Sequence, residues 1–355
     1  MLGSRCYRPF KRSLGRFQWY SSLPTSPLGA HVEIQGNKYP TDHLTNITPS
    51  VISKIPLRLH TQRNHPLSTL RSLIESHYPD FAHLSSFSPL VSPFKNFDQL
   101  SFPLDHPGRS ATDSYYVNKD LMLRTHTSAH EVEVFEKGET KWLLTADVYR
   151  RDEIDASHYP VFHQVEGARL FDASPSAMRE VEEDNERLLH HLALSNIVIE
   201  DVKHVSETNP VQAGHDPYHA EIVAQNLKLS LNGLILRLFG SAAGATPSEP
   251  LRVRWIEAYF PFTSPSFEVE VFFRGKWLEI LGCGVVEQAT LNTSSTCACL
   301  SDRCSLAPEH SFVLRCTKQD WLGVRTRTRE DSHDPLLHSR HSLVLVYGRT
   351  LPVPV

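Results

Sequence analysis

The sequence predicts an α+β fold with a mainly antiparallel sheet flanked by helices. Residues 267–271 alternate strictly between apolar and acidic side chains, as a strand of an antiparallel sheet does. Residues 142–148 and 158–171 form two further strand-like stretches joined by a short polar connection, which is typical of an antiparallel hairpin. The sequence contains no Gly-rich phosphate loop of the Rossmann or Walker type, so a doubly wound parallel sheet is disfavoured.

The overall composition excludes some classes of protein. The chain has 355 residues, which leaves room for two or three domains and a sizeable core. Its formal net charge is −4, so any contact with nucleic acid has to use a local basic patch. No apolar run is long enough to cross a bilayer, and we expect no membrane segment.

The first 35 residues differ in composition from the rest of the chain. They are rich in serine and aromatic residues, lack the apolar core of a signal peptide, and contain no acidic residue before Glu33. Basic, serine-rich and acid-poor segments are typical of mitochondrial transit peptides, so we predict that residues 1–35 are such a peptide. The alternative is a disordered basic N-terminal arm. The basic residues of this segment are Arg5, Arg8, Lys11, Arg12 and Arg16.

Further elements follow along the chain. Residues 64–78 predict a helix in which Asn64 is the cap and Pro66 occupies the first turn. Residues 79–110 are rich in Pro, Ser and Phe and predict a loop, and residues 113–130 predict a strand that opens into another loop.

Two longer helices and a strand complete the predicted elements. Residues 174–193 predict a helix begun by Ser174 and Pro175, with an acidic solvated face. Residues 219–240 predict a second helix, ended by Gly240, and residues 277–284 predict a strand that closes on glycines.

The hairpin around residues 148–167 has the pattern of a nucleotide and amino-acid site. Two arginines follow the first strand, and arginine suits bidentate recognition of phosphate. Phe162 offers a flat face for a base, which Arg151 or another cation could cover from the other side. Gln164 and Glu166 are two residues apart, so they share one face of the strand and suit a bound ammonium group. The alternative for an isolated Arg-Arg-Asp is surface charge.

The same stretch resembles motif 2 of the class II aminoacyl-tRNA synthetases. Together with "LRTHTSAH" at 123–130, "DHPGRSATDSYYV" at 105–117 and "FPFTSPSFEVEV" at 260–271, the chain resembles the phenylalanine–tRNA ligases of the single-chain mitochondrial type. The resemblance covers about 45–288 and implies an incomplete class II catalytic core with the antiparallel fold predicted above. It also implies a monomer in the mitochondrial matrix.

The resemblance implies roles for individual residues. Arg150 matches the motif 2 arginine on the ATP α-phosphate and the amino-acid carboxyl, and is the expected catalytic residue. The ATP-binding residues it implies are Arg150, Asp152, His158 and Phe162. The phenylalanine-binding residues it implies are His126, Ser128, Ala129, His130, Glu131, Gln164, Glu166, Phe260, Phe262, Gly282 and Gly284. The two glycines are expected at the pocket floor, where they leave room for a phenyl ring.

The implied chemistry is ATP-dependent attachment of phenylalanine to tRNA(Phe) through a phenylalanyl-adenylate. The phenylalanine carboxylate attacks the α-phosphate of ATP with Mg²⁺ present, and a terminal ribose hydroxyl of the tRNA then attacks the adenylate carbonyl. No metal site made of protein ligands is expected. The alternative function is a truncated non-catalytic paralogue that binds amino acid, nucleotide or RNA, and ATP–pyrophosphate exchange separates the two.

Residues 289–355 match no element of that family. Four of the six cysteines, Cys297, Cys299, Cys304 and Cys316, lie there, and their spacing favours unrelated thiols over paired zinc knuckles. The arginine-rich stretch 321–341 could be a basic nucleic-acid tail or a metal- or pH-sensing tract. A third interpretation is that the tail was never selected as protein.

Codon arithmetic favours the third interpretation. Shifted by one base from Trp321, permitted codons can encode G-W-A-F-G-L-G-L-E-R-I, which resembles motif 3 of the same family. We therefore expect residues 289–320 to be aberrant sequence and the remainder to be exon read out of frame. The tail is expected to be poorly ordered, and the chain as written is expected to have weak or no activity.

Overall fold

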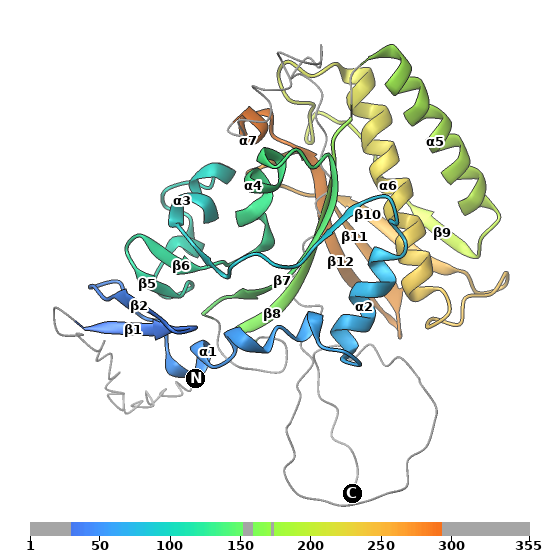
Figure 1. Cartoon of the computed structure of the whole chain (residues 1–355). Helices are drawn as coiled ribbons and strands as arrows, with labels where there is room; N and C mark the ends of the chain where they lie inside the picture. Colours follow the sequence, from blue (N-terminus) through green and yellow to red (C-terminus); the bar gives the residue numbers. More distant parts are fainter. Residues whose placement is uncertain (1–29, 152–158, 172–173, 293–355) are drawn as a thin grey trace, which may run out of the picture.

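A computed structural model of the chain describes residues 30–151, 159–171 and 174–292 (Figure 1). Within these ranges, antiparallel sheets are flanked by helices, and the α+β class predicted from the sequence is confirmed. Residues 1–29 of the predicted transit peptide and nearly all of the predicted aberrant tail lie outside the described residues, whereas residues 30–35 of that segment are described and include a strand over His31–Ile34.

The predicted hairpin is the centre of the first sheet. Strands β7 (Lys141–Tyr149) and β8 (Val161–Arg169) pair antiparallel from Lys141 opposite Arg169 to Tyr149 opposite Val161. Strand β3 (Ala82–Leu84) joins β7 in parallel on the other side. Both long strands are buried over most of their length, which explains why β7 is almost continuously apolar.

The second large sheet has the strand order β12–β11–β10–β9. Strands β10 (Leu251–Glu257), β11 (Thr263–Phe273) and β12 (Lys276–Val286) are antiparallel, and β9 (Ile197–Glu200) is parallel to β10. The alternation predicted for 267–271 falls inside β11, where the apolar side chains are buried. A register shift between Thr263 and Ser266 bends β11 at the end nearest the candidate site.

Two small sheets and short helices lie beside the hairpin. Strands β4 (Leu90–Val91), β6 (Leu121–Leu123) and β5 (Tyr116–Asn118) form one sheet, and β1 (His31–Ile34) and β2 (Asn37–Pro40) form the other. The short helices are α1 (Pro49–Ile52), α3 (Pro93–Asn96), α4 (Glu131–Glu136) and α7 (Gln288–Asn292).

The prediction of a single loop over 79–110 was incomplete, because β3, β4, α3 and two 3₁₀ turns lie there. These elements have two to four residues each, too few to produce a detectable hydrophobic period.

Three longer helices follow the predictions closely. In α2 (Pro66–Glu75) the proline occupies the first turn as predicted, but the cap is His65, whose ring nitrogen accepts from the Leu67 amide, rather than Asn64. Asn64 has φ +66 instead, which asparagine tolerates in a turn. Helix α5 (Pro175–Ala193) begins after the predicted cap Ser174. Helix α6 (Pro217–Phe239) begins two residues earlier than predicted, after Asp216, and ends before Gly240.

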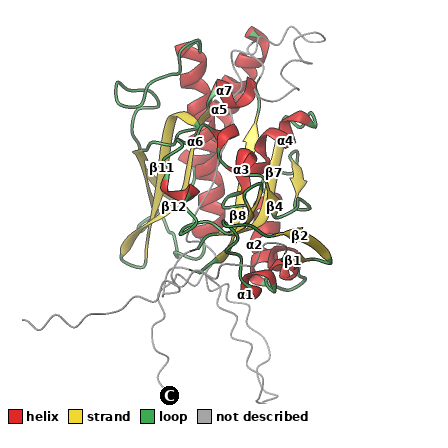
Figure 2. Cartoon of the chain, turned by 90° about the vertical axis from the view of Figure 1, so that its left-hand side faces the viewer, coloured by secondary structure: helices red, strands yellow, loops and turns green. Residues whose placement is uncertain are grey.

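Helix α6 covers one face of the second sheet, and α5 packs on its outer side (Figures 1 and 2). Leu227, Leu231 and Ile235 of α6 pack in one core with Trp255 and Phe267 of the sheet. No helix within the described residues is long and apolar enough to cross a membrane.

Candidate active site

One face of β8 carries the polar pair predicted from the sequence. Phe162, Gln164 and Glu166 alternate with His163 and Val165, so they share a face as the strand period requires. Gln164 is 2% exposed and Glu166 is 0% exposed. Polar groups this deeply buried need hydrogen-bond partners, since each unpaired group lowers the stability of the fold by about 1–3 kcal/mol.

Those partners come from a 3₁₀ turn, η5 (Thr127–His130), which directly precedes α4. The amide of Thr127 donates to Oε1 of Gln164 at 3.1 Å, and the hydroxyl of Ser128 donates to Oε2 of Glu166 at 3.1 Å. The two hydrogen bonds join residues that are 37 and 38 positions apart in the sequence, so they hold η5 against β8. The structure thus brings together three of the predicted amino-acid-binding residues, Ser128, Gln164 and Glu166.

Arg150 lies at the end of the same hairpin. Its Nε donates to the carbonyl of Thr125 at 3.0 Å, and its guanidinium carbon is 5.3 Å from the ring centroid of Phe162. The sequence predicts that Arg151 or another cation covers a bound base from the side opposite Phe162, whereas in the structure Arg150 lies over Phe162 itself. Arg151 instead donates to the carbonyl of Ala111 at 2.7 Å. Predicted residues Asp152 and His158 lie outside the described residues.

Aromatic rings form a continuous row from the segment just before β11 towards η5. Phe260 and Phe262 stack with ring centroids 5.8 Å apart and planes 11° apart. Phe262 contacts Phe102 at 5.6 Å, and Phe102 is parallel to the imidazole of His126 at 5.5 Å and 8°. The row joins predicted residues from two distant segments. Its middle member, Phe102, was not singled out, because a lone Phe in a Pro-rich stretch carries no local signal.

The two predicted glycines have different neighbours. A Cβ built at Gly282 would lie 2.5 Å from Cζ of Phe260, so the glycine lets that ring lie directly on β12. A Cβ at Gly284 would lie 2.5 Å from the carbonyl oxygen of Pro265 and 2.8 Å from Cβ of Thr263. Gly282 therefore belongs to the aromatic row, whereas Gly284 accommodates the bend of β11.

Three other predicted residues point to different surroundings. His130 stacks on Phe87 at 4.7 Å and accepts from Nη1 of Arg124 at 3.0 Å, and burial lowers its pKa. Ala129 packs in an apolar cluster with Phe97 and Met122. Glu131 is 1% exposed at the start of α4. Described contacts therefore connect His130 to Arg124 rather than to the Gln164–Glu166 pair.

The opposite face of the hairpin carries a buried ion pair. Arg124 donates through Nη2 to Oδ1 of Asp147 at 3.1 Å and through Nε to the Asp147 carbonyl at 2.6 Å, and the Tyr149 hydroxyl donates to the same carboxylate. Burial alone would raise the pKa of Asp147, but Arg124 and Tyr149 outweigh it and hold the pKa below its ordinary value.

Two buried histidines lie beside this pair. His163 of β8 and His60 of η2 (Leu59–Thr61) have ring centroids 5.2 Å apart. Desolvation lowers the pKa of His60 to about 4 and that of His163 to about 3, against the attraction of Asp147. In the part of the chain that the structure describes, no group of three or more His, Cys, Asp or Glu residues is placed to hold a metal ion.

Comparison with known proteins matches this site to one family. The family described as "tRNA synthetases class II core domain (F)" matches residues 52–193 and 212–298. The mitochondrial phenylalanine–tRNA ligase of Saccharomyces cerevisiae is 40% identical over 315 residues, covering 80% of this chain and 66% of that protein. That of Rattus norvegicus is 40% identical over 276 residues, covering 75% and 54%.

A more distant relative is the phenylalanine–tRNA ligase alpha subunit of Prochlorococcus marinus (strain NATL2A). It is 30% identical over 239 residues, covering 66% of this chain and 54% of that protein. The chain thus spans between about half and two thirds of the length of these curated relatives.

Proposed function

Because the chain belongs to the family described as "tRNA synthetases class II core domain (F)", we propose that it takes part in ATP-dependent attachment of phenylalanine to tRNA(Phe). The reaction proceeds through a phenylalanyl-adenylate and serves translation in mitochondria. The relatives named as mitochondrial phenylalanine–tRNA ligases, 40% identical to the chain, support this choice of amino acid and compartment.

The observation that carries the proposal is the junction of η5 with β8, beside Arg150. Gln164 and Glu166 of β8 are buried and hydrogen-bonded to η5, Glu166 through the hydroxyl of Ser128. Arg150 lies over Phe162 at the end of the hairpin. A carboxylate and an amide suit an α-ammonium group, and a guanidinium suits a carboxylate and an α-phosphate. One end of the site therefore matches the amino acid and the other matches ATP.

These residues act by positioning and by charge. Glu166 and Gln164 orient the α-ammonium, so that the phenylalanine carboxylate points towards Arg150 and the α-phosphate. Arg150 stabilises the negative charge that develops as the carboxylate oxygen bonds to phosphorus and pyrophosphate leaves. No protein nucleophile takes part. We propose that Mg²⁺ enters with the substrate as the ATP complex, since Mg²⁺ keeps several waters and binds readily through phosphate oxygens.

The aromatic row supplies the specificity in this proposal. Phe260 and Phe262 present flat apolar surfaces against which the substrate ring packs edge to face. A dry surface of this kind has no partner for the hydroxyl of tyrosine, and burying that hydroxyl without a hydrogen bond costs about 1–3 kcal/mol.

We also propose the remaining assignments made from the sequence. Residues 1–35 direct the chain to the mitochondrial matrix, residues 45–288 form the catalytic core, and the enzyme acts as a monomer on tRNA(Phe). Residues 289–355 are proposed to be aberrant, and the coding DNA tests this directly. If the frame shifted by one base after Asp320 does not encode a motif 3 arginine, that proposal is wrong.

The experiment that tests the function measures ligand binding by the purified chain. Equilibrium dialysis with labelled phenylalanine and tyrosine, and with the stable adenylate mimic phenylalanyl-sulfamoyl-adenosine, reports on both ends of the site. We expect phenylalanine to bind at least about tenfold more tightly than tyrosine. Equal affinity for the two amino acids, or no binding of the mimic, would contradict the proposal. ATP–pyrophosphate exchange, expected to be weak for this chain, follows as the catalytic readout.

A further inference from the structure

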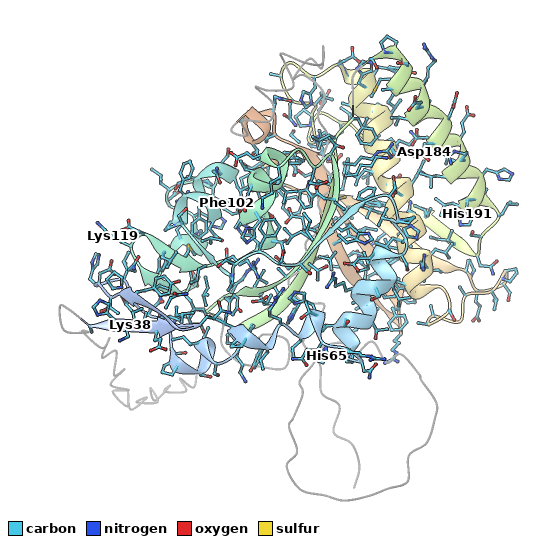
Figure 3. The ribbon with its side chains drawn as sticks, in the orientation of Figure 1. Lys38, His65, Phe102, Lys119, Asp184 and His191 are labelled. Atoms are coloured by element: carbon cyan, nitrogen blue, oxygen red, sulfur yellow. The ribbon has the colours of Figure 1, made fainter. Side chains whose placement is uncertain are left out.

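Phe102 lies between the two halves of the candidate amino-acid site. Its ring is parallel to His126 on one side, with centroids 5.5 Å apart, and contacts Phe262 at 5.6 Å on the other. It also meets His106 edge to face at 4.8 Å. Figure 3 places Phe102 across the β7–β8 hairpin from Asp184 and His191 of α5, on the side of α3 and α4. The ring is half-buried, so one part of its surface remains accessible.

The loop that carries Phe102 is held by one arginine. Arg109 donates through Nε to the carbonyl of Pro103 at 2.8 Å and through Nη2 to the carbonyl of Phe102 at 2.7 Å. The same Nη2 pairs with Asp98 at 2.8 Å, and the guanidinium lies over the ring of Phe97 at 4.9 Å. Arg109 belongs to the stretch "DHPGRSATDSYYV" at 105–117, which contributes no residue to the predicted ATP- and phenylalanine-binding sets.

We propose that Phe102 is a specificity-determining wall of the aromatic amino-acid site and that Arg109 is its positioning residue. The inference rests on the proposed function, because it assigns Phe102 to the same substrate. Phe102 is the ring that connects Phe262, which directly precedes β11, with His126, at the start of η5. It fixes the spacing between the part of the site that packs on the substrate ring and the part that holds its polar end.

The physical effect expected of Phe102 is modest and selective. An aromatic pair contributes a few-fold in affinity beyond the area it buries, and two such pairs meet at this ring. Leucine at 102 keeps apolar volume but loses the flat face, so phenylalanine binding weakens while the nucleotide end is unaffected. Because Arg109 acts through the Phe102 main chain, its loss adds little once the ring is gone.

The experiment uses the full chain with Phe102→Leu, Arg109→Lys and the double variant. The control is Leu104→Ala, two residues along the same loop, where the side chain is 87% exposed. Equilibrium dialysis measures phenylalanine and ATP separately. We expect phenylalanine affinity to fall about threefold to tenfold in Phe102→Leu, by a similar or smaller factor in Arg109→Lys, and no further in the double variant. ATP affinity stays unchanged in all of them.

A second readout needs no ligand. In ¹³C-histidine-labelled protein, the His126 imidazole signal, assigned by its loss in His126→Asn, carries a ring-current shift from the parallel Phe102. This signal moves in Phe102→Leu and stays in place in Leu104→Ala. The inference is overturned if the His126 signal does not move in Phe102→Leu, or if that variant binds phenylalanine as tightly as the unaltered chain. Either result leaves the proposed function standing. An unaltered chain that binds no phenylalanine overturns the proposed function and this inference with it.

Discussion

The two faces of the β7–β8 hairpin both carry buried polar side chains, but these are paired in different ways. On the η5 side, Gln164 and Glu166 meet a main-chain amide and a hydroxyl. On the opposite side, Asp147 meets the guanidinium of Arg124 in a closed ion pair. The contrast teaches that alternate residues of one strand can serve different purposes. The described partner of Glu166 is the neutral hydroxyl of Ser128, whereas Asp147 meets a cation within the fold.

The strongest test of this contrast removes the acid from the ion pair. Asp147→Ala leaves Arg124, about 1% exposed, buried without its counter-ion. Breaking a buried pair in this way costs about 3–5 kcal/mol of unfolding free energy. Urea unfolding followed by circular dichroism measures the loss. The matched control is Asp80→Ala, whose pair with Lys141 is at the surface and is worth less than about 1 kcal/mol. Equal losses in the two variants would remove the distinction between the faces.

A change at the ligand end should have the opposite signature. Arg150→Ala removes the guanidinium over Phe162, and we expect affinity for phenylalanyl-sulfamoyl-adenosine to fall about 10- to 100-fold. The unfolding midpoint should change little, since a hydrogen bond to the Thr125 carbonyl and a contact with the Phe162 ring each contribute little to the free energy of unfolding. Arg151→Ala is the control, because that side chain is exposed and bonds to Ala111. A large stability loss without a binding loss would assign Arg150 to the fold.

The back face should also respond to pH. His60 and His163 have folded-state pKa values of about 4 and about 3, below the ordinary 6.5. At a pH between these folded-state values and 6.5, the two histidines bind protons in the unfolded chain but not in the folded chain. The stability that the neutral, buried histidines contribute is therefore fully present above pH 6.5 and is lost as the pH falls towards 4. From these two histidines we expect about 3 kcal/mol less stability at pH 5.5 than at pH 7.5, measured by urea unfolding.

The histidine assignment has its own control. In His60→Leu the slope of unfolding free energy against pH should be shallower over the same interval, since one ring with a lowered pKa is removed. The remainder of the slope comes from His163 and from other histidines whose pKa burial lowers, such as His130. An unchanged slope would mean that the acid sensitivity comes from other groups.

How much of this could be predicted from the sequence depends on the range of the interaction. The period of β8 is local, so Gln164 and Glu166 could be placed on one face in advance. The pairing of Arg124 with Asp147 spans 23 residues, and it depends on a loop packing against a strand. Nothing local marks either residue as a partner of the other. The family resemblance located the HTS element and the FPFT stretch, and the structure brings them together through a ring, Phe102, that no pattern indicated.

The positions where contacts differ from the local pattern follow the same rule. Asn64 has the residue type of a cap, but the neighbouring histidine takes that position once Asn64 turns into the left-handed region. His130 lies in the family motif and stays a predicted phenylalanine-binding residue, and its described contacts include Arg124, Phe87 and Glu133. Composition and motif identify residue types. The direction in which a buried side chain points is decided by packing against segments far away in the chain.

The smallest expected effect is also the most selective test of the two faces. Glu166→Gln keeps the shape of the side chain and can still accept from Ser128, so the fold should lose less than about 1 kcal/mol. It removes the charge offered to the α-ammonium, and phenylalanine affinity should fall about tenfold. 3-Phenylpropionate, which lacks the ammonium, should bind the unaltered chain and the variant equally well. If both ligands weaken together, Glu166 supports the site as a structural element, and the front face is then no different in kind from the back.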